Sequence, residues 1–154
     1  MFRVGFGYDS HRFEDGRKLV LGGVEFPGER GLKGHSDADV LVHAIIDALL
    51  GAADLGDIGS HFPDTDPRFA GADSCALLEA IVCEIKTTGW KIGNVDATVI
   101  CEHPKIGPKK AEIKSRLETA LGCKVSVKGK TNEKMDDVGA GIGIEVHAVA
   151  LLEK

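Results

Sequence analysis

Near the N-terminus the chain reads Gly5-Phe6-Gly7-Tyr8-Asp9-Ser10-His11-Arg12-Phe13, and this segment sets the architecture of what surrounds it. Residues 2–8 alternate as in a β-strand, with apolar side chains on one side and two glycines on the other. Side chains two positions apart on a strand share a face, so an extended run would place Asp9 and His11 together on the glycine-lined face. A carboxylate and an imidazole in that arrangement provide two ligands of a zinc site. A turn-capping Asp beside a solvated His is the plainer interpretation.

Length and charge limit the classes of protein to consider. A chain of 154 residues predicts a single domain over 1–154 that buries about 68–70% of its unfolded surface. The net charge is −5 and the pI is near 5.7, without a basic cluster long enough to follow a phosphate backbone. Nucleic-acid binding is therefore not expected. No apolar run approaches the roughly 18 residues that cross a membrane.

The four cysteines indicate the compartment. Cys75, Cys83, Cys101 and Cys123 form no CxxC pair and no spacing typical of metal ligands, so reduced and mostly buried thiols are expected. Strand-like sequence from Met1 leaves no room for a signal peptide in these residues. Both observations predict a cytoplasmic location.

Hydrophobic periodicity and turn residues divide the chain into elements. Extended runs are expected at 2–8, 18–21, 24–26, 95–101, 124–129 and 144–152. Helices are expected from about 36 to 53, from 73 to 88, and up to Leu121 with Gly122 as its C-cap. Residues 54–72 read as a long ordered functional loop, and residues 139–143 as a flexible bend.

The order ββ-α-α-β-α-ββ predicts an α+β fold, a mixed sheet with helices packed on one face. The other face of such a sheet needs a cover, either water or another chain. The last strand, 144–152, is continuously apolar apart from Glu145 and His147. This composition favours another chain as the cover.

The first helix carries a polar stripe on an otherwise apolar cylinder. Ser36 is expected as its N-cap, with Asp39 three positions later in a capping-box variant. Asp39, His43 and Asp47 follow at intervals of four and therefore share one face. His43 is either a core histidine satisfied by one of these carboxylates or a metal ligand.

Two glycine-containing patterns resemble nucleotide motifs and are set aside. Gly129-Lys130-Thr131 looks like the end of a P-loop, but Lys124 occupies the position that needs glycine and no helix pattern follows. The glycine cluster at 139–143 does not open a helix, so it is not a dinucleotide fingerprint.

A stronger constellation combines Asp9, His11 and His43. Three N/O ligands with one open position describe a catalytic zinc site rather than a structural one. Asp39 or Asp47 could orient His43 through its second ring nitrogen. His35 and Ser36, at the expected start of the helix, would add N–H groups suited to a phosphate. The residues thus predict a metal-assisted reaction on an anionic substrate.

These motifs, with others along the chain, resemble the 2-C-methyl-D-erythritol 2,4-cyclodiphosphate synthase family of the non-mevalonate isoprenoid pathway. The similarity spans the whole chain in register and is most specific over 34–67. The matching segments are GYDSHRF (7–13), LGG (21–23), GHSDADVLVHAIIDALLGAADLGDIGSHFPDTDP (34–67), GADS (71–74), GNVDATVI (93–100), PK (104–105) and TNEK (131–134).

The resemblance implies a phosphorus–oxygen lyase that works as a homotrimer with active sites between adjacent subunits. The 2-phosphate of 4-diphosphocytidyl-2-C-methyl-D-erythritol 2-phosphate attacks the β-phosphate, CMP leaves, and the cyclic diphosphate forms. A zinc-type ion would be held by the residues matching Asp9, His11 and His43. A second ion, magnesium or manganese, would bridge the phosphates and contact Glu133.

The resemblance also implies roles for individual residues. His35 and Thr131 would hydrogen-bond the developing charge, and the loop from Asp57 would hold the methylerythritol end. The strand end at Cys101 and the following turn resemble the cytidine pocket. Together the implied substrate-binding residues are Asp9, Ser10, His11, His35, Ser36, Asp57, Ile58, Gly59, Phe62, Pro63, Asp64, Thr65, Asp66, Cys101, Pro104, Lys105, Ile106, Lys130, Thr131, Asn132, Glu133 and Lys134. Lys130 is our own addition, as an extra cation near the phosphates.

The chain departs from the family pattern just after residues 131–134. Family members commonly carry Gly-Phe and then Gly-Arg there, whereas this chain has Asp136-Asp137 and Gly139-Ala140. In the family the aromatic and the arginine face a central channel, where the arginine can bind a phosphate-bearing isoprenoid. That secondary site is therefore not expected in this chain.

Two other functions use the same residues. A metal-dependent phosphatase or nucleotide pyrophosphatase would use the three ligands with a water nucleophile and release a linear phosphate. In a non-catalytic trimeric binding module, Asp9 and the histidines would be structural and would bind no metal.

Overall fold

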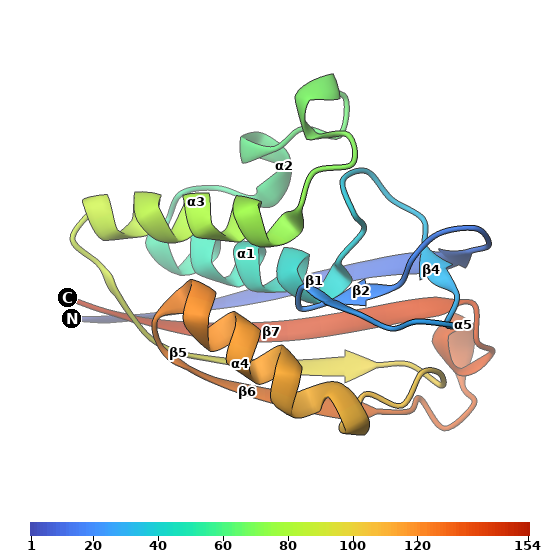
Figure 1. Cartoon of the computed structure of the whole chain (residues 1–154). Helices are drawn as coiled ribbons and strands as arrows, with labels where there is room; N and C mark the ends of the chain where they lie inside the picture. The colour runs from blue at the N-terminus through green and yellow to red at the C-terminus, as the bar shows by residue number, and fades with distance from the viewer.

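A computed structural model describes residues 1–154 as a five-stranded mixed sheet with helices on one face (Figure 1). The sheet order is β4-β1-β7-β5-β6, and β5 and β6 pair in parallel while the other pairs are antiparallel. The five strands are β1 (Phe2–Glu14), β4 (Gly31–Leu32), β5 (Lys91–Ile100), β6 (Lys124–Lys130) and β7 (Gly143–Glu153). A separate ribbon pairs β2 (Val20–Leu21) with β3 (Val24–Glu25). The predicted α+β class and mixed sheet are confirmed.

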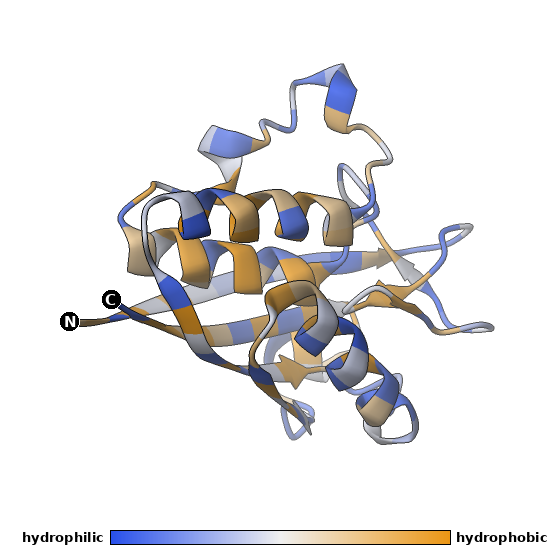
Figure 2. Cartoon of the chain, turned by 60° about the vertical axis from the view of Figure 1, so that its left-hand side comes forward, coloured by the Kyte–Doolittle hydropathy of each residue, from blue (hydrophilic) through white to orange (hydrophobic).

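Three long helices form the second layer. They are α1 (Val40–Ala53), α3 (Ser74–Thr87) and α4 (Lys110–Leu121). Helix α1 lies against β1 and β7, and α3 packs on its outer side (Figure 1). Most of α1 is coloured as hydrophobic in Figure 2, and ten of its fourteen residues are buried, because it has neighbours on nearly every side. Shorter helical turns are α2 (Ile58–His61), η1 (Pro67–Phe69), η2 (Gly107–Lys109) and α5 (Asp136–Gly139).

The glycines of β1 allow α1 to pack directly on the strand backbone. A Cβ atom added at Gly5 would lie 1.9 Å from the carbonyl oxygen of Ala48, and one at Gly7 would lie 1.9 Å from that of Ala44. These alanines are four apart and therefore share one helix face. The glycine face of β1 and the alanine face of α1 thus bring the two backbones together, and Asp9 continues the same face of the strand.

Replacing Gly7 with alanine should destabilise the fold severely. The new methyl group would meet backbone rather than a movable side chain, so α1 would have to shift away from β1. We expect a loss above about 4 kcal/mol in the free energy of unfolding, measured by urea denaturation. Gly51→Ala is the matched control, because nothing lies within 4 Å of its added Cβ and alanine favours helix by about 0.5–1 kcal/mol. Equal stabilities of the two variants would contradict this account.

The opposite face of β1 is apolar and uncovered by the chain. Phe2, Val4, Phe6 and Tyr8 are 71%, 68%, 61% and 44% exposed, and Val149 on neighbouring β7 is 42% exposed. Large side chains of this kind in a contiguous row usually mark a contact surface. One sheet face is thus left open by the chain, as predicted, but β1 rather than the last strand supplies most of its apolar surface, because the apolar residues of β7 are mostly buried within the chain.

Several predicted boundaries were wrong. Strand β1 runs on to Glu14 because β7 pairs with it as far as Arg12 and β4 continues the ladder. Helix α1 begins at Val40, with Asp39 rather than Ser36 as its N-cap. Ser36 and Ala38 have positive φ angles of 51° and 56°, so the chain from 36 to 39 is a turn.

Two segments expected to be irregular contain short helices. Residues 54–72 include α2 and η1, each started by an aspartate side chain: Asp57 accepts from the Ser60 amide and Asp66 from the Arg68 amide. The glycine cluster at 139–143 begins within α5, whose last residue is Gly139, so the predicted flexible bend is partly a helical turn. Capping carboxylates explain the first case, since they satisfy the free N–H groups of a single turn.

The strand predicted at 95–101 begins earlier, since β5 starts at Lys91, whereas the predicted ends of the two later helices agree with the structure. Helices α3 and α4 end near Thr88 and at Gly122, where Gly122 adopts a left-handed φ of 71°. All four cysteines are free thiols as predicted, but only Cys75 and Cys101 are buried, whereas Cys123 is partly exposed and Cys83 is exposed. None of the helices is both long and apolar enough to cross a lipid bilayer.

Candidate active site

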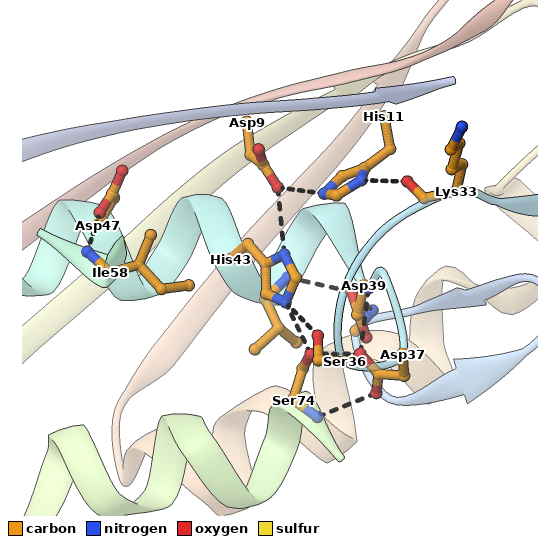
Figure 3. A network of polar contacts seen from close by, with 12 residues as sticks. Asp9, His11, Lys33, Ser36, Asp37, Asp39, His43, Asp47, Ile58 and Ser74 are labelled. Carbon is orange, nitrogen blue, oxygen red and sulfur yellow. Dashed lines mark hydrogen bonds and ion pairs between the residues drawn. The ribbon is translucent and has the colours of Figure 1, made fainter. Parts of the chain in front are cut away.

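Asp9, His11 and His43 converge beside the junction of β1 and α1 (Figure 3). Asp9 Oδ2 lies 2.8 Å from His11 Nε2 and 3.2 Å from His43 Nδ1. The three side chains are 28%, 16% and 11% exposed, respectively. Asp9 and His11 emerge together because they alternate with Ser10 on the glycine-lined face of β1. The predicted side-by-side placement is therefore confirmed, and His43 joins it from the helix.

The Asp9 carboxylate is held in its charged form. Burial alone would raise the pKa of Asp9, but hydrogen bonds and charge attraction from His11 and His43 outweigh it and lower that pKa to about 2. Burial would lower the pKa of His11, but its hydrogen bond and attraction to Asp9 raise it overall. The charged Asp9 carboxylate therefore favours a cation at this point.

The backbone orients His11. Its Nδ1 lies 2.6 Å from the carbonyl oxygen of Lys33, which can only accept a hydrogen bond. Nδ1 therefore carries a proton, and Nε2 faces Asp9. Gly34 makes this approach possible, because a Cβ there would lie 2.7 Å from the His11 ring.

The three ligand atoms fit a zinc-type ion. They lie within 4.8 Å of one another. Ligands at about 2.0–2.2 Å from a tetrahedral zinc ion are separated by roughly 3.3–3.6 Å, so small adjustments would suffice. Two imidazoles and one carboxylate leave a fourth position for a substrate or water, which is typical of catalytic zinc sites. The plainer interpretation, a turn-capping Asp9 with a solvated His11, is wrong, since β1 continues and both side chains are largely buried.

A cleft of about 470 Å³ opens next to this triad. Its lining combines the triad with the loop before α1 and the segment around α2. The lining residues are Asp9, His11, Gly34, His35, Ser36, His43, Ile58, Gly59, Phe62, Pro63, Asp64, Phe69 and Leu77. Sequence reasoning named most of these and missed Gly34, Phe69 and Leu77, whose proximity depends on how the 54–72 segment folds back.

The 54–72 segment is anchored to α1 and packs on itself. Asp47 on α1 accepts a hydrogen bond of 2.8 Å from the Ile58 amide, and burial raises the pKa of Asp47. Phe62 and Phe69 meet edge to face with their ring centroids 5.2 Å apart. The segment is therefore ordered, as predicted, and Asp47 holds this loop instead of orienting His43.

His35 presents an unpaired nitrogen in this cleft. Its Nδ1 lies 3.0 Å from the carbonyl oxygen of Asp64, while its Nε2 is buried without a partner. A buried polar atom without a partner usually marks a place that a ligand or water completes. Arg17, which the sequence did not single out, supports the same loop by donating to the carbonyl oxygens of Gly34 and Ser36 at 2.8 and 3.3 Å.

A second cleft, of about 280 Å³, lies at the ends of β5 and β6. It contains six predicted residues together with three others. Its lining consists of Cys101, Pro104, Lys105, Ile106, Gly107, Lys110, Gly129, Lys130 and Thr131. Burial raises the pKa of the Cys101 thiol to about 11, so this cysteine lines the cleft as a neutral group. No lining residue is shared with the first cleft, and β7 lies between β1 and β5 in the sheet.

The remaining predicted residues line neither cleft. Ser10 points to the exposed side of β1, Asp57 and Asp66 cap short helices, and Thr65 is exposed. Asn132, Glu133 and Lys134 form a turn after β6, with φ angles of 53° and 60° at the last two. The Glu102 carboxylate accepts from the Asn132 amide at 2.9 Å and from the Lys134 amide at 3.4 Å. Glu102, not predicted, thus connects this turn to the second cleft.

Two expectations about the start of α1 were wrong. His35 and Ser36 precede the helix by a turn, so they offer no helix N-terminus to a phosphate. The buried Asp39 side chain accepts from the amides of Gly22, Gly23 and Val42 at 3.0, 2.7 and 3.1 Å, and burial raises its pKa to about 6. Asp39 therefore holds the β2–β3 ribbon to α1 instead of orienting the His43 ring.

Comparison with known proteins is consistent with this geometry. A family model described as the YgbB family matches residues 2–153. The 2-C-methyl-D-erythritol 2,4-cyclodiphosphate synthase of Dechloromonas aromatica is 55% identical over 156 residues, covering 99% of this chain and 98% of its own. Both matches extend over nearly the whole chain.

Solved structures of similar proteins have the same fold. The bifunctional IspDF of Campylobacter jejuni superposes with a TM-score of 0.95 at 37% identity, covering 99% of this chain and 42% of its own. IspF of Plasmodium falciparum, solved as a CDP complex, gives a TM-score of 0.85 at 36% identity and covers 98% and 95% of the two chains. The chain therefore belongs to the YgbB family, the family of the 2-C-methyl-D-erythritol 2,4-cyclodiphosphate synthases.

Proposed function

We propose that the chain, as one domain over residues 1–154, converts 4-diphosphocytidyl-2-C-methyl-D-erythritol 2-phosphate into 2-C-methyl-D-erythritol 2,4-cyclodiphosphate and CMP. The observation that carries the proposal is the Asp9, His11 and His43 triad at the mouth of a cleft, in a chain 55% identical to a synthase of that name. An oxygen of the 2-phosphate attacks the β-phosphorus, and the bond from that phosphorus to the CMP oxygen breaks. The reaction is thus a phosphorus–oxygen lyase step in the non-mevalonate isoprenoid pathway.

Intramolecular phosphoryl transfer depends on alignment and on neutralising charge rather than on covalent help from the protein. When bound, a zinc-type ion at the triad and a magnesium or manganese ion near Glu133 would polarise and neutralise phosphate oxygens. With its ring protonated, His35 could donate from the unpaired Nε2 to a phosphate oxygen, and Thr131 can donate a hydrogen bond from the second cleft. Lys105 and Lys130 add positive charge beside Thr131.

The two ends of the substrate have separate places. The first cleft offers Asp64 and the Phe62-Pro63 wall to the methylerythritol end, where carboxylates accept hydrogen bonds from hydroxyl groups. The second cleft, with Cys101, Pro104 and Ile106, would take the cytidine end. IspF of Plasmodium falciparum was solved with CDP, which has the nucleoside and phosphates of that end.

We further propose that the active protein is a homotrimer with each active site between neighbouring subunits. The two clefts are separate within one chain, and the apolar row on β1 has no cover from the same chain. A neighbour packed on that row would bury it and could bring its second cleft to the first cleft of this subunit. This arrangement explains both observations at once.

The product distinguishes this function from the two alternatives. With substrate and added zinc and magnesium, we expect CMP and a cyclic diphosphate in the phosphorus NMR spectrum, and no reaction after removal of metal by a chelator. A linear phosphate product would instead identify a phosphatase or pyrophosphatase. A folded protein that binds no metal and leaves the substrate intact would identify a binding module.

A further inference from the structure

The second nitrogen of His43 lies against serine side chains from two different segments (Figure 3). Nε2 lies 2.8 Å from the hydroxyl of Ser74, the first residue of α3, and 3.2 Å from the hydroxyl of Ser36. Ser74 is fully buried and Ser36 is 8% exposed. Water therefore has little access to this side of the ring, and the serines decide how it is hydrogen-bonded.

Asp37 sets the direction of the Ser74 hydroxyl. Its Oδ1 forms a short hydrogen bond with the Ser74 hydroxyl, and its Oδ2 accepts from the Ser74 amide at 2.9 Å. An ionised carboxylate can only accept hydrogen bonds. The Ser74 hydroxyl must therefore donate to Asp37, which leaves its oxygen lone pairs free to accept from His43 Nε2–H.

We propose that Asp37 and Ser74 are positioning residues that favour the His43 tautomer with a proton on Nε2, the tautomer that leaves Nδ1 free to bind a metal ion. In the metal-free chain the Asp9 carboxylate, 3.2 Å from Nδ1, competes with Ser74 for the ring proton. The inference rests on the proposed function only in assigning the triad to a metal. The balance between the two tautomers can be measured in the metal-free chain.

His11 and His43 are oriented by different kinds of hydrogen-bond partner. Lys33 supplies a backbone carbonyl to His11, whereas His43 depends on a side-chain pair from the loop before α1 and from the start of α3. His43 therefore has Ser74 as its Nε2 partner only when α3 is docked on the turn at Asp37. Partners of metal-bound histidines of this kind typically change metal affinity by about 10–100-fold when removed.

Ser74→Ala tests the proposal directly. We expect the variant to bind zinc about 10–100-fold more weakly than the parent, measured by competition with a chromophoric chelator. In the metal-free parent at alkaline pH, nitrogen NMR should show both His43 tautomers, because Ser74 accepts from Nε2 and Asp9 from Nδ1. Ser74→Ala should shift the balance toward the form protonated at Nδ1, since Ser36 is the remaining partner of Nε2 and lies farther away.

Asp73→Ala is the matched control. Asp73 caps the same end of α3 by accepting from the Cys75 amide at 2.9 Å, but it makes no hydrogen bond to His43. It should lower the free energy of unfolding by about 0.5–2 kcal/mol while the zinc affinity and the His43 tautomer stay as in the parent. Asp37→Asn should weaken zinc binding in the same direction as Ser74→Ala.

Several results would overturn the proposal. One is a metal-free Ser74→Ala variant whose ratio of His43 tautomers equals that of the parent; another is a folded Ser74→Ala variant that binds zinc within twofold of the parent. If Asp73→Ala lost as much zinc affinity as Ser74→Ala, loosening of α3 would explain the loss and the Ser74 hydroxyl would have no specific role. None of these readouts uses turnover, so a protein that shows the tautomer shift but releases no CMP would refute the proposed reaction and leave this inference standing.

Discussion

Replacing His43 with alanine should remove zinc binding and CMP release together. The variant loses one of the three metal-binding side chains, and only Asp9 and His11 remain. Removing even an outer partner of a ligand costs about 10–100-fold, so loss of the ligand itself should lower turnover by more than about a hundredfold. Metal analysis of the purified variant and assay of CMP release provide the two measurements.

Folding must be shown to survive in that variant. The His43 side chain is 11% exposed, and its removal leaves the hydroxyl of Ser74 without its neighbour, which costs about 1–3 kcal/mol. Circular dichroism and urea denaturation measure this loss. His61→Ala is a matched control for metal content, since His61 pairs with Glu84 and lines neither cleft. Normal turnover by folded His43→Ala would refute the assignment of the triad.

The second large effect concerns the arrangement of the active site between subunits. His43→Ala damages the first cleft and Thr131→Ala damages the second, so each variant alone should have very low activity. If each site takes its first cleft from one subunit and its second from a neighbour, a mixed trimer can contain a site with neither substitution. Random 1:1 mixing gives such a site in about one quarter of cases.

The measurement is turnover after co-expression or joint refolding of the two variants. Recovery toward about a quarter of the parental activity is expected for sites between subunits. Sites contained within one chain would show no recovery, because every chain then carries one defect. The double variant His43→Ala, Thr131→Ala mixed with the parent is a suitable control, since it gives intact sites only where two parental chains meet.

The sequence predicted the metal triad because its evidence is local. Asp9 and His11 are two apart, and strand geometry alone places them on one face. His43 stood out as an imidazole on a nearly all-apolar helix, which requires a partner. The resemblance over 34–67 then indicated which segment forms the wall of the cleft, and seven of the ten substrate-binding residues predicted within that segment line it.

Partners supplied by distant segments could not be predicted in this way. Asp39 and Asp47 were reasonable partners for His43 by helical spacing, but both carboxylates accept backbone amides from other segments. Buried N–H groups of loops require acceptors, and that requirement outweighs spacing along one helix. Ser74 lies 31 residues from His43, and no pattern in the sequence indicates that α3 begins against the ring.

The sequence by itself therefore determined the α+β class, the strand that carries Asp9 and His11, and the helix that carries His43. Side-chain alternation and helical periodicity are local properties, so they survive without knowledge of the neighbours. Only the tertiary structure decided how closely these elements meet and which atoms of each ring are free. The contact of Gly7 with the backbone at Ala44 and the docking of α3 on Asp37 bring groups far apart in sequence within a few ångströms, and such distances depend on packing of the whole chain.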